Sequence, residues 1–201
     1  MAMSSDPALA LTVAYLRLNG YFVVTEQELH VRESNGYRAI TDIDIIAIRP
    51  PNPPGPAHHH GGVSVEECII VTEVDSAMDI DPTRFDVIIG EVKTAEAVFN
   101  LAIRTPGALH AALRRTGDLY TEPHDKVVDR IIAQGVAITP TARVRLAVFA
   151  GHGRVGPGMT VHLGDAARFI RSHLASHQDL YRITRFSDPV VALLALLDKV
   201  G

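Results

Sequence analysis

Apolar residues recur along the chain at two spacings, one typical of helices and one typical of strands. The first such segment, residues 7–18, carries apolar residues at helical spacing. Asp6 precedes it as a candidate N-cap, Pro7 occupies the first helical position, and Asn19-Gly20 follows as a stop signal. The pattern therefore predicts a helix over residues 7–18.

Two alternating segments and a turn signal follow this helix. Residues 21–31 and 37–48 alternate loosely between apolar and polar side chains, and Asn35-Gly36 between them is typical of tight hairpin turns. The chain then becomes rich in proline, glycine and histidine over residues 49–62. This composition is typical of exposed loops, so we expect a β-hairpin followed by a long surface connection.

The remaining segments show both patterns. Short apolar runs predict further strands at 67–74, 85–92, 144–150 and 159–163. Helical spacing predicts helices at 106–115, 123–134 and 165–176, and a final helix capped by Asp188-Pro189. Elements in this order predict an α/β fold with a mixed central β-sheet flanked by helices. No internal repeat or break in composition divides the sequence, so we expect a single domain over residues 1–201.

The composition indicates a globular protein of the reducing cytoplasm. Of the 201 residues, 47% are hydrophobic and 21% are charged, which are ordinary globular values. The N-terminal residues lack the basic and apolar regions of a secretory signal. The longest apolar runs, such as 190–197, fall well short of the ~20 residues of a membrane span. The single cysteine, Cys68, excludes an internal disulfide, and we expect it to be a small buried hydrophobe.

The charge of the chain limits how it could bind nucleic acid. Its net charge is −4 and its pI is 6.2, whereas proteins that bind nucleic acid through bulk charge are usually basic. Such a function would therefore need a local basic patch. The chain has sixteen arginines but only three lysines. Lysine offers a compact ammonium group that arginine does not. One of the three lysines, Lys93, lies two residues after Glu91 at the end of a predicted strand.

Three polar residues interrupt two of the predicted apolar strands, and their types indicate chemistry. Asp44 stands among isoleucines in a predicted strand, where an unpaired carboxylate would be costly. Glu91 and Lys93 lie two residues apart at the end of another apolar strand, so their side chains share one face. Two carboxylates and an ammonium group suit a magnesium site, because Mg²⁺ binds through one or two carboxylates and leaves room for a phosphate.

These segments carry a resemblance to a known family. Ile-Asp-Ile-Ile-Ala (43–47) and Gly-Glu-Val-Lys-Thr (90–94) resemble the Asp…Glu-x-Lys core of the PD-(D/E)xK nuclease superfamily, which includes restriction endonucleases and Holliday-junction resolvases. The helix over 7–18 is similar to the start of that fold. The resemblance implies a restriction endonuclease-like core of order α-β-β-β-α-β over roughly residues 7–150, with further β/α elements over roughly 151–201.

The resemblance also implies a role for each motif residue. Asp44 and Glu91 would bind Mg²⁺, or Mn²⁺ in its place, together with the main-chain carbonyl of Val92. The metal would stabilise charge on the scissile phosphate and help to generate hydroxide. Lys93 would hold or polarise the attacking water and offset negative charge. The implied activity is hydrolysis of DNA phosphodiester bonds.

The sequence departs from the family pattern in three places. Many relatives place a glutamate in the first helix, whereas residues 7–18 contain no acid. Acids that could replace it are Asp42, Glu26 and Glu28. Asp44 and Glu91 are 47 residues apart (91 − 44), a long interval that the loop must account for. Glu73 ends an apolar run that imitates the motif, but Asp75 follows where lysine is required, so Glu91 is preferred.

Other signals have ordinary explanations beside functional ones. Gly151 to Gly156 matches G-x-G-x-x-G, but a dinucleotide site needs a helix starting near residue 154, and the sequence favours a glycine-rich hairpin. His58-His59-His60 lacks the spacing of a closed zinc site, so we expect adventitious metal binding there. His110 and His124 fit either proton transfer or a satisfied surface position.

Two further features stay open between two interpretations. A group of arginines after the motif strand would either grip phosphates or form a solvated helix face: Arg104, Arg114 and Arg115. The final helix, residues 190–197, would serve as a homodimer contact or pack into the core.

The sequence thus supports two hypotheses of different classes. The first is a metal-dependent nuclease that acts on DNA through Asp44, Glu91 and Lys93. The second is a catalytically inactive, nuclease-like module for binding or assembly, which is motivated by the missing helix acid and by the net charge of −4.

Overall fold

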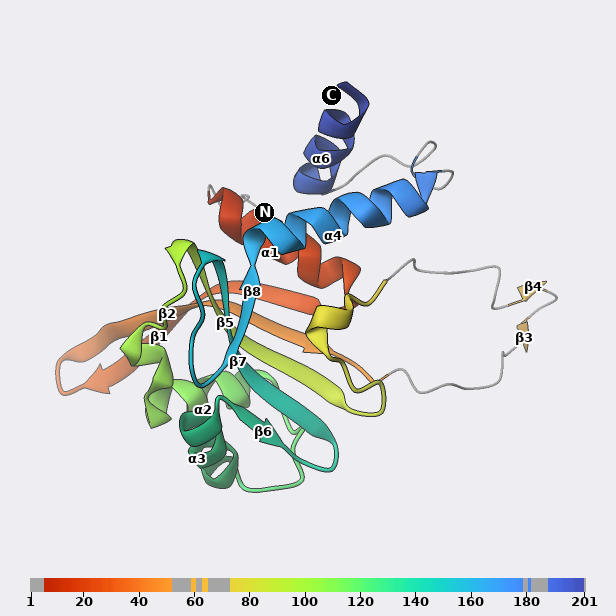
Figure 1. Cartoon of the computed structure of the whole chain (residues 1–201). Helices are drawn as coiled ribbons and strands as arrows, with labels where there is room; N and C mark the ends of the chain where they lie inside the picture. The colour runs from red at the N-terminus through yellow and green to blue at the C-terminus, as the bar shows by residue number, and fades with distance from the viewer. Residues whose placement is uncertain are drawn as a thin grey trace.

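The structure is a computed structural model, and its description covers residues 6–51, 59–60, 63–64, 73–178, 181 and 188–200. Within these residues the chain forms an α/β fold around one mixed, curled sheet of six strands (Figure 1). The strands of this sheet are β1 (Phe22–Glu33), β2 (Gly36–Arg49), β5 (Phe85–Glu96), β6 (Val136–Ile138), β7 (Ala142–His152) and β8 (Met159–His162). The short strands β3 (His59–His60) and β4 (Val63–Ser64) pair only with each other.

The strand order is β1-β2-β5-β7-β6, and β8 also pairs with β7. β6 lies beside residues 143–145 of β7, and β8 lies beside residues 147–150. These two short strands therefore share one edge of β7, while β5 occupies the other edge. The pairs β5–β7 and β7–β8 are parallel, and the remaining pairs of the sheet are antiparallel.

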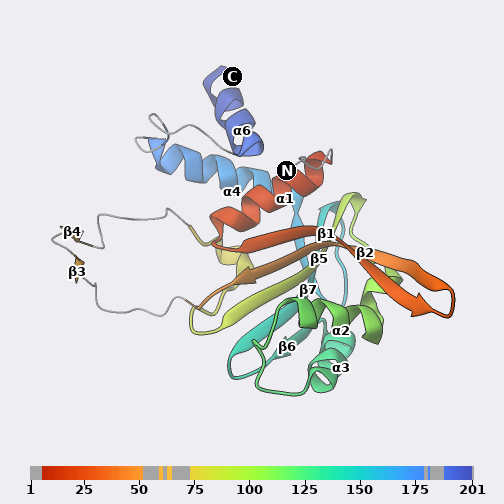
Figure 2. The same ribbon diagram turned by 180° about the vertical axis from the view of Figure 1, so that it is seen from behind.

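Helices cover both faces of the sheet (Figures 1 and 2). One side carries α1 (Pro7–Leu18), α4 (Leu163–Ser176) and α6 (Pro189–Val200). The other side carries α2 (Pro106–Arg115) and α3 (His124–Gln134). Two 3₁₀ turns, η2 (Ser76–Met78) and η3 (Leu101–Arg104), lie in the connections on either side of β5. The predicted α/β class, with a mixed sheet flanked by helices, is therefore confirmed.

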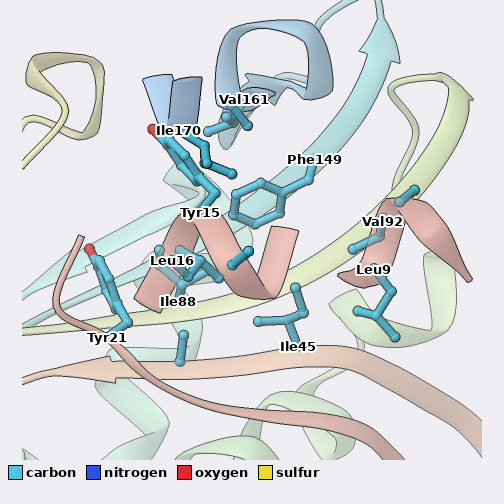
Figure 3. Close-up of a cluster of buried hydrophobic side chains, with 14 of the residues drawn as sticks. Leu9, Tyr15, Leu16, Tyr21, Ile45, Ile88, Val92, Phe149, Val161 and Ile170 are labelled. Carbon is cyan, nitrogen blue, oxygen red and sulfur yellow. The ribbon is translucent and has the colours of Figure 1, made fainter. Parts of the chain in front are cut away.

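Alternation along the strands creates two cores. Ile88 of β5 belongs to the core under α1 and α4, whereas its neighbours Val87 and Ile89 belong to the core under α2 and α3. We call these the α1/α4 core and the α2/α3 core. Figure 3 shows the first, where Tyr15 of α1 and Ile170 of α4 meet Phe149 of β7. Full burial of each large apolar side chain contributes roughly 1.5–3 kcal/mol, so the sheet is anchored from both faces.

The predicted first helix, over residues 7–18, is confirmed. Asp6 caps α1, because its Oδ1 accepts a hydrogen bond of 2.8 Å from the backbone N–H of Ala8. Gly20 follows the helix with φ of +86°, a left-handed conformation that favours glycine. The predicted hairpin is also present, since β1 and β2 pair in antiparallel fashion up to Glu33 and Gly36.

Other sequence predictions were incomplete, and one was wrong. The short strand β6 and both 3₁₀ turns were not predicted. The stretch 153–158 is not a hairpin, because β8 returns parallel to β7 rather than antiparallel. No helix begins near residue 154, so the dinucleotide interpretation is also excluded. Most of the predicted loop 49–62 and nearly all of the predicted strand 67–74, with Cys68, lie outside the described residues.

A buried ion-pair network joins the starts of β5 and β7. The Asp86 carboxylate accepts hydrogen bonds from Arg143 and Arg145, at 2.6 and 2.9 Å to their Nη2 atoms. Arg145 also donates to the main-chain oxygen of Met78 at 2.8 Å and to the Tyr21 hydroxyl at 3.1 Å. The network therefore ties the η2 turn and the entry to β1 to the central strands.

None of the helices described here is long and apolar enough to cross a membrane.

Candidate functional site

The sheet brings Asp44 and Glu91 together on its α2/α3 side. β2 and β5 are antiparallel neighbours with Ile45 paired to Gly90, and continuing this register places Asp44 beside Glu91. Along each strand these acids share a face with Ile46 and Ile89, both members of the α2/α3 core. The 47-residue interval is therefore compatible with adjacent strands.

Asp44 is held in place by the main chain of β5. Its Oδ2 accepts a hydrogen bond of 2.8 Å from the backbone N–H of Val92. The ladder between β2 and β5 ends at Ile45 and Gly90, so the Asp44 carboxylate satisfies an amide that the strand pairing leaves free. One carboxylate oxygen is used in this way, and the other stays available to a ligand.

Glu91 and Lys93 form a close ion pair. Lys93 Nζ lies 2.6 Å from Glu91 Oε2. The Glu91 side chain is only 3% exposed, whereas 34% of the Lys93 side chain is exposed. The carboxylate is therefore almost fully shielded from solvent, while its lysine partner is partly exposed.

Burial dominates the electrostatics of Glu91. Desolvation raises the pKa of Glu91, and the neighbouring charge of Asp44 raises it further. The hydrogen bond and charge of Lys93 and a backbone hydrogen bond from Asn100 act in the opposite direction, but the net shift is upward. For Lys93, desolvation lowers the pKa, but the hydrogen bond and charge of Glu91 outweigh it, so the pKa is raised. The pair thus couples a costly buried carboxylate to a firmly charged ammonium.

The predicted ligand Val92 lies between the two motif residues. Its N–H bonds to Asp44, and its side chain is buried in the α1/α4 core on the opposite face. The main chain at Val92 therefore runs directly beside the Asp44 carboxylate. A ligand role for its carbonyl stays a prediction.

The first helix lies on the wrong side of the sheet to complete this site. α1 packs into the α1/α4 core, whereas Asp44 and Glu91 face the α2/α3 side. Among the candidate substitutes, Asp42 lies two residues before Asp44 on β2, and its charge is one of the causes of the raised pKa of Lys93. Asp42 is therefore the better-placed third acid.

The other two candidate acids lie on β1. Glu28 pairs with Asp42 in the strand register and is exposed. Glu26 falls opposite Asp44 between the pairs Thr25–Ile45 and Gln27–Ile43. Its φ is +54°, a left-handed conformation that is strained for a residue other than glycine. Neither acid has a described hydrogen bond to the motif residues, so both lie at the margin of the site.

Glu73, which imitates the motif in sequence, is not part of this site. Its backbone N–H bonds to the carbonyl of Leu18 at the end of α1, at 3.0 Å. Its carboxylate lies 2.8 Å from Nδ1 of His173 on α4. Glu73 therefore lies on the α1/α4 side, across the sheet from Asp44.

The predicted basic residues divide into two kinds. Arg104 is half-buried and donates to the main-chain oxygen of Ile132 at 3.2 Å, which ties η3 to α3. Arg114 and Arg115 are exposed at the C-terminal end of α2, and Arg115 Nε lies 3.3 Å from Gln27 Oε1 on β1. Their contacts with nucleic acid stay a prediction. The side chains of Arg114 and Arg115 are exposed and could reach a ligand, whereas the half-buried Arg104 is held against α3.

The remaining predicted positions lie apart from the motif residues. His110 Nε2 lies 2.9 Å from Asp125 Oδ1, and the His124 ring packs against Tyr120. α6 buries Val191 and Ala195, while its other face leaves apolar residues exposed, namely Leu193, Leu196, Leu197 and Val200. Helix α6 therefore shows both core packing and free apolar surface, and the homodimer stays a prediction. The side chains of His58-His59-His60 lie outside the description.

The contacts of Asn100 were not predicted from the sequence. Its backbone hydrogen bond lowers the pKa of Glu91, its Nδ2 donates to Thr41 Oγ1 at 3.0 Å, and its Oδ1 caps η3 through Ala102. Asn100 thereby holds the segment that follows β5 against β2. The only sequence signal was an asparagine ahead of a short turn, which is common in loops without function.

Comparison with known proteins adds no relative to this picture. No protein-family model, no curated protein and no solved structure matches the chain.

Proposed function

We propose that this chain is a metal-dependent phosphodiesterase that hydrolyses DNA through Asp44, Glu91 and Lys93. The observation that supports it best is the meeting of these three groups on adjacent strands, with Lys93 Nζ 2.6 Å from Glu91 Oε2. The order α1, β1, β2, β5, α2, β7 is also that of a restriction endonuclease-like core, with α3 and β6 added before β7.

The donor set suits a hard cation. Asp44 and Glu91 offer carboxylate oxygens on one face, and Mg²⁺ or Mn²⁺ would bind to them while keeping positions open for water and phosphate. Such a metal supplies charge stabilisation to the scissile phosphate and lowers the pKa of water. With a cation bound to Glu91, Lys93 would be the neighbouring group able to hold the attacking water and to offset negative charge.

The test is cleavage of supercoiled, linear, single-stranded and branched DNA by the purified chain with Mg²⁺ or Mn²⁺. We expect cleavage by the wild type and its loss in Asp44→Asn and Glu91→Gln. The matched control is Asp118→Asn, an exposed acid with no described contact, which should cleave normally. Absence of cleavage on every DNA form, or cleavage that survives both substitutions, would refute the proposal.

A second candidate is a nuclease-like module that binds without cutting. It is favoured by the ion pair, in which Lys93 occupies one oxygen of Glu91, and by the lack of an acid in α1. Calorimetric titration with Mn²⁺ separates the two. Binding that is lost in Asp44→Ala supports the enzyme, whereas no binding by the wild type supports the module.

A further inference from the structure

A second group of metal-ligand side chains lies across the sheet from the proposed nuclease site. It consists of Glu73, His173 and His177, each of which offers one ligand atom, and these three atoms all lie within 4.8 Å of one another. Within the described chain this is the one group of three or more His, Cys, Asp or Glu residues that meets so closely. We propose that these three residues form a binding site for a borderline divalent cation of the zinc class.

Helix periodicity brings the two histidines together. His173 and His177 are four residues apart at the C-terminal end of α4, so they project on the same side. Their ring centroids lie 4.4 Å apart. This separation is short enough for one ring nitrogen of each to reach a common ion at ~2.0–2.1 Å.

The third group, Glu73, is carried by a segment that is fastened to α1. The Glu73 N–H bonds to the Leu18 carbonyl at 3.0 Å, and the Asp75 N–H bonds to Asn19 Oδ1 at 2.7 Å. The Tyr15 hydroxyl then donates to Asp75 Oδ2 at 2.8 Å. The carboxylate is therefore presented to α4 by a held main chain, and this lowers the ordering cost of forming a site.

Both imidazoles already have the outer partners that metal-bound histidines use. His177 Nδ1 lies 2.9 Å from the His173 carbonyl, so it carries the proton and leaves the Nε2 lone pair for a ligand. His173 Nε2 lies 2.9 Å from the Tyr181 hydroxyl, while its Nδ1 faces Glu73 Oε2 at 2.8 Å. A ring nitrogen engaged with an oxygen on the far side fixes the tautomer and orientation of a metal-bound histidine.

Burial gives the site a closed side and an open side. His173 is completely buried, whereas 46% of the Glu73 side chain is exposed. An ion could therefore enter beside Glu73 and replace the proton between Glu73 Oε2 and His173 Nδ1, which would leave to water, while His173 Nε2–H would donate to the Tyr181 hydroxyl. Water from the exposed side would fill a remaining position, as is usual where three protein ligands hold zinc.

The donor set distinguishes this site from the first one. Two imidazole nitrogens and one carboxylate suit Zn²⁺ and its analogue Co²⁺, whereas Mg²⁺ prefers oxygen ligands. The two sites also use opposite faces of the sheet. A bound ion would join α4 to the end of α1 through Glu73, and it would stabilise the fold because the unfolded chain lacks the site.

The test is titration of the metal-free full-length protein with Co²⁺, followed by visible absorption and by competition with Zn²⁺. His58, His59 and His60 are first replaced by alanine in the parent protein, because three adjacent histidines bind such metals adventitiously. The ligand variants are His177→Ala and Glu73→Gln. The control variants are His152→Ala, an exposed histidine on β7, and Glu91→Gln, which reports on the opposite face.

We expect the parent protein to bind one Co²⁺ per chain with absorption typical of four-coordinate nitrogen and oxygen ligation, and Zn²⁺ to displace it and raise the Tm. Affinity should fall by at least ~100-fold in both ligand variants, since even the loss of an outer partner costs ~10–100-fold. His152→Ala should bind as the parent does, and Glu91→Gln should keep the four-coordinate absorption, because it can remove only Co²⁺ held on the opposite face of the sheet.

Two results would overturn the proposal: no four-coordinate absorption of Co²⁺ in the parent at one equivalent, or the same absorption persisting in both ligand variants. The first would leave a hydrogen-bonded Glu–His–Tyr cluster that only supports the fold. Should His177→Ala fail to fold, the exposed change Glu73→Gln decides alone. DNA cleavage with Mg²⁺ is measured separately, so failure of either proposal is distinguishable from failure of the other.

Discussion

At Glu91 the demands of the proposed function and of stability conflict. Its carboxylate is buried beside a second carboxylate, and a single ammonium group compensates for this. A group placed in this way is expensive for the fold and useful to a cation. The cost and the use can be measured separately.

We expect Glu91→Gln to gain stability relative to the wild type as the pH rises. Burial raises the pKa of Glu91 above its ordinary value of 4.5, so between these two pKa values the folded chain binds more protons than the unfolded chain. Stability of the wild type therefore falls as the pH rises through this window, and the glutamine variant lacks this loss. Urea unfolding of both chains at pH 4 and at pH 8 measures the difference. A difference that stays constant, or shrinks with pH, would contradict the raised pKa.

Lys93 allows metal binding to be separated from cleavage. Because its ammonium lies against Glu91 Oε2, it competes with any cation for that oxygen. We expect Lys93→Met to bind Mn²⁺ at least as tightly as the wild type, measured by calorimetry, but to cleave DNA ~10²–10⁴-fold more slowly. Lys126→Met, an exposed change on α3, is the matched control. Weaker Mn²⁺ binding together with unchanged cleavage would assign Lys93 a purely structural role.

That Glu91 and Lys93 share a face could be predicted, because alternation decides which side chains of one strand point the same way. That Asp44 lies beside them was implied only by the resemblance. The ion pair of Lys93 and the contact of Asn100 could not be predicted, since they depend on how the chain leaves β5. The contact between Glu73 and His173 could not be predicted from the sequence either. They lie 100 residues apart, and only the packing of α1 on α4 brings them together.

At the scale of elements, long periodic segments were predictable and short ones were not. α2 has the bounds predicted from its apolar face and its Pro106 start, because period and cap agree. β6 has only three residues, too few to show a period. The parallel return of β8 was missed because the glycines from Gly151 to Gly158 signal a turn but not its direction.

The Asp86 network holds the central strands together, and its removal should be costly. We expect Asp86→Ala to lower the free energy of unfolding by about 3–5 kcal/mol, because it leaves the buried guanidinium of Arg145 without a carboxylate and leaves Arg143 with only the exposed Asp79. Urea denaturation measures this change. Asp118→Ala, at an exposed position, should stay within about 0.5 kcal/mol. An Asp86 variant as stable as the wild type would show that water reaches these arginines.

At the scale of the whole molecule, the two proposed sites lie on opposite faces of the sheet. The α2/α3 side carries the acids proposed to act on DNA, and the α1/α4 side carries the Glu73 cluster. With a net charge of −4, attraction of DNA to the first side depends on local positive charge and on bound cations. The exposed arginines at the end of α2 lie on that side, next to β1.

The salt dependence of DNA binding can therefore locate the nucleic-acid face. We expect the double variant Arg114→Ala/Arg115→Ala to bind DNA more weakly and to reduce the slope of log K against log salt by up to about 2, since each phosphate contact contributes about 0.9. Fluorescence anisotropy with Ca²⁺ in place of Mg²⁺ measures binding while limiting cleavage. The matched control, Arg168→Ala/Arg171→Ala on α4, removes the same charge from the opposite side of the sheet. Equal effects of the two variants would mean that DNA responds to net charge alone. A larger effect of the control would place the binding surface on the α1/α4 side, away from Asp44 and Glu91.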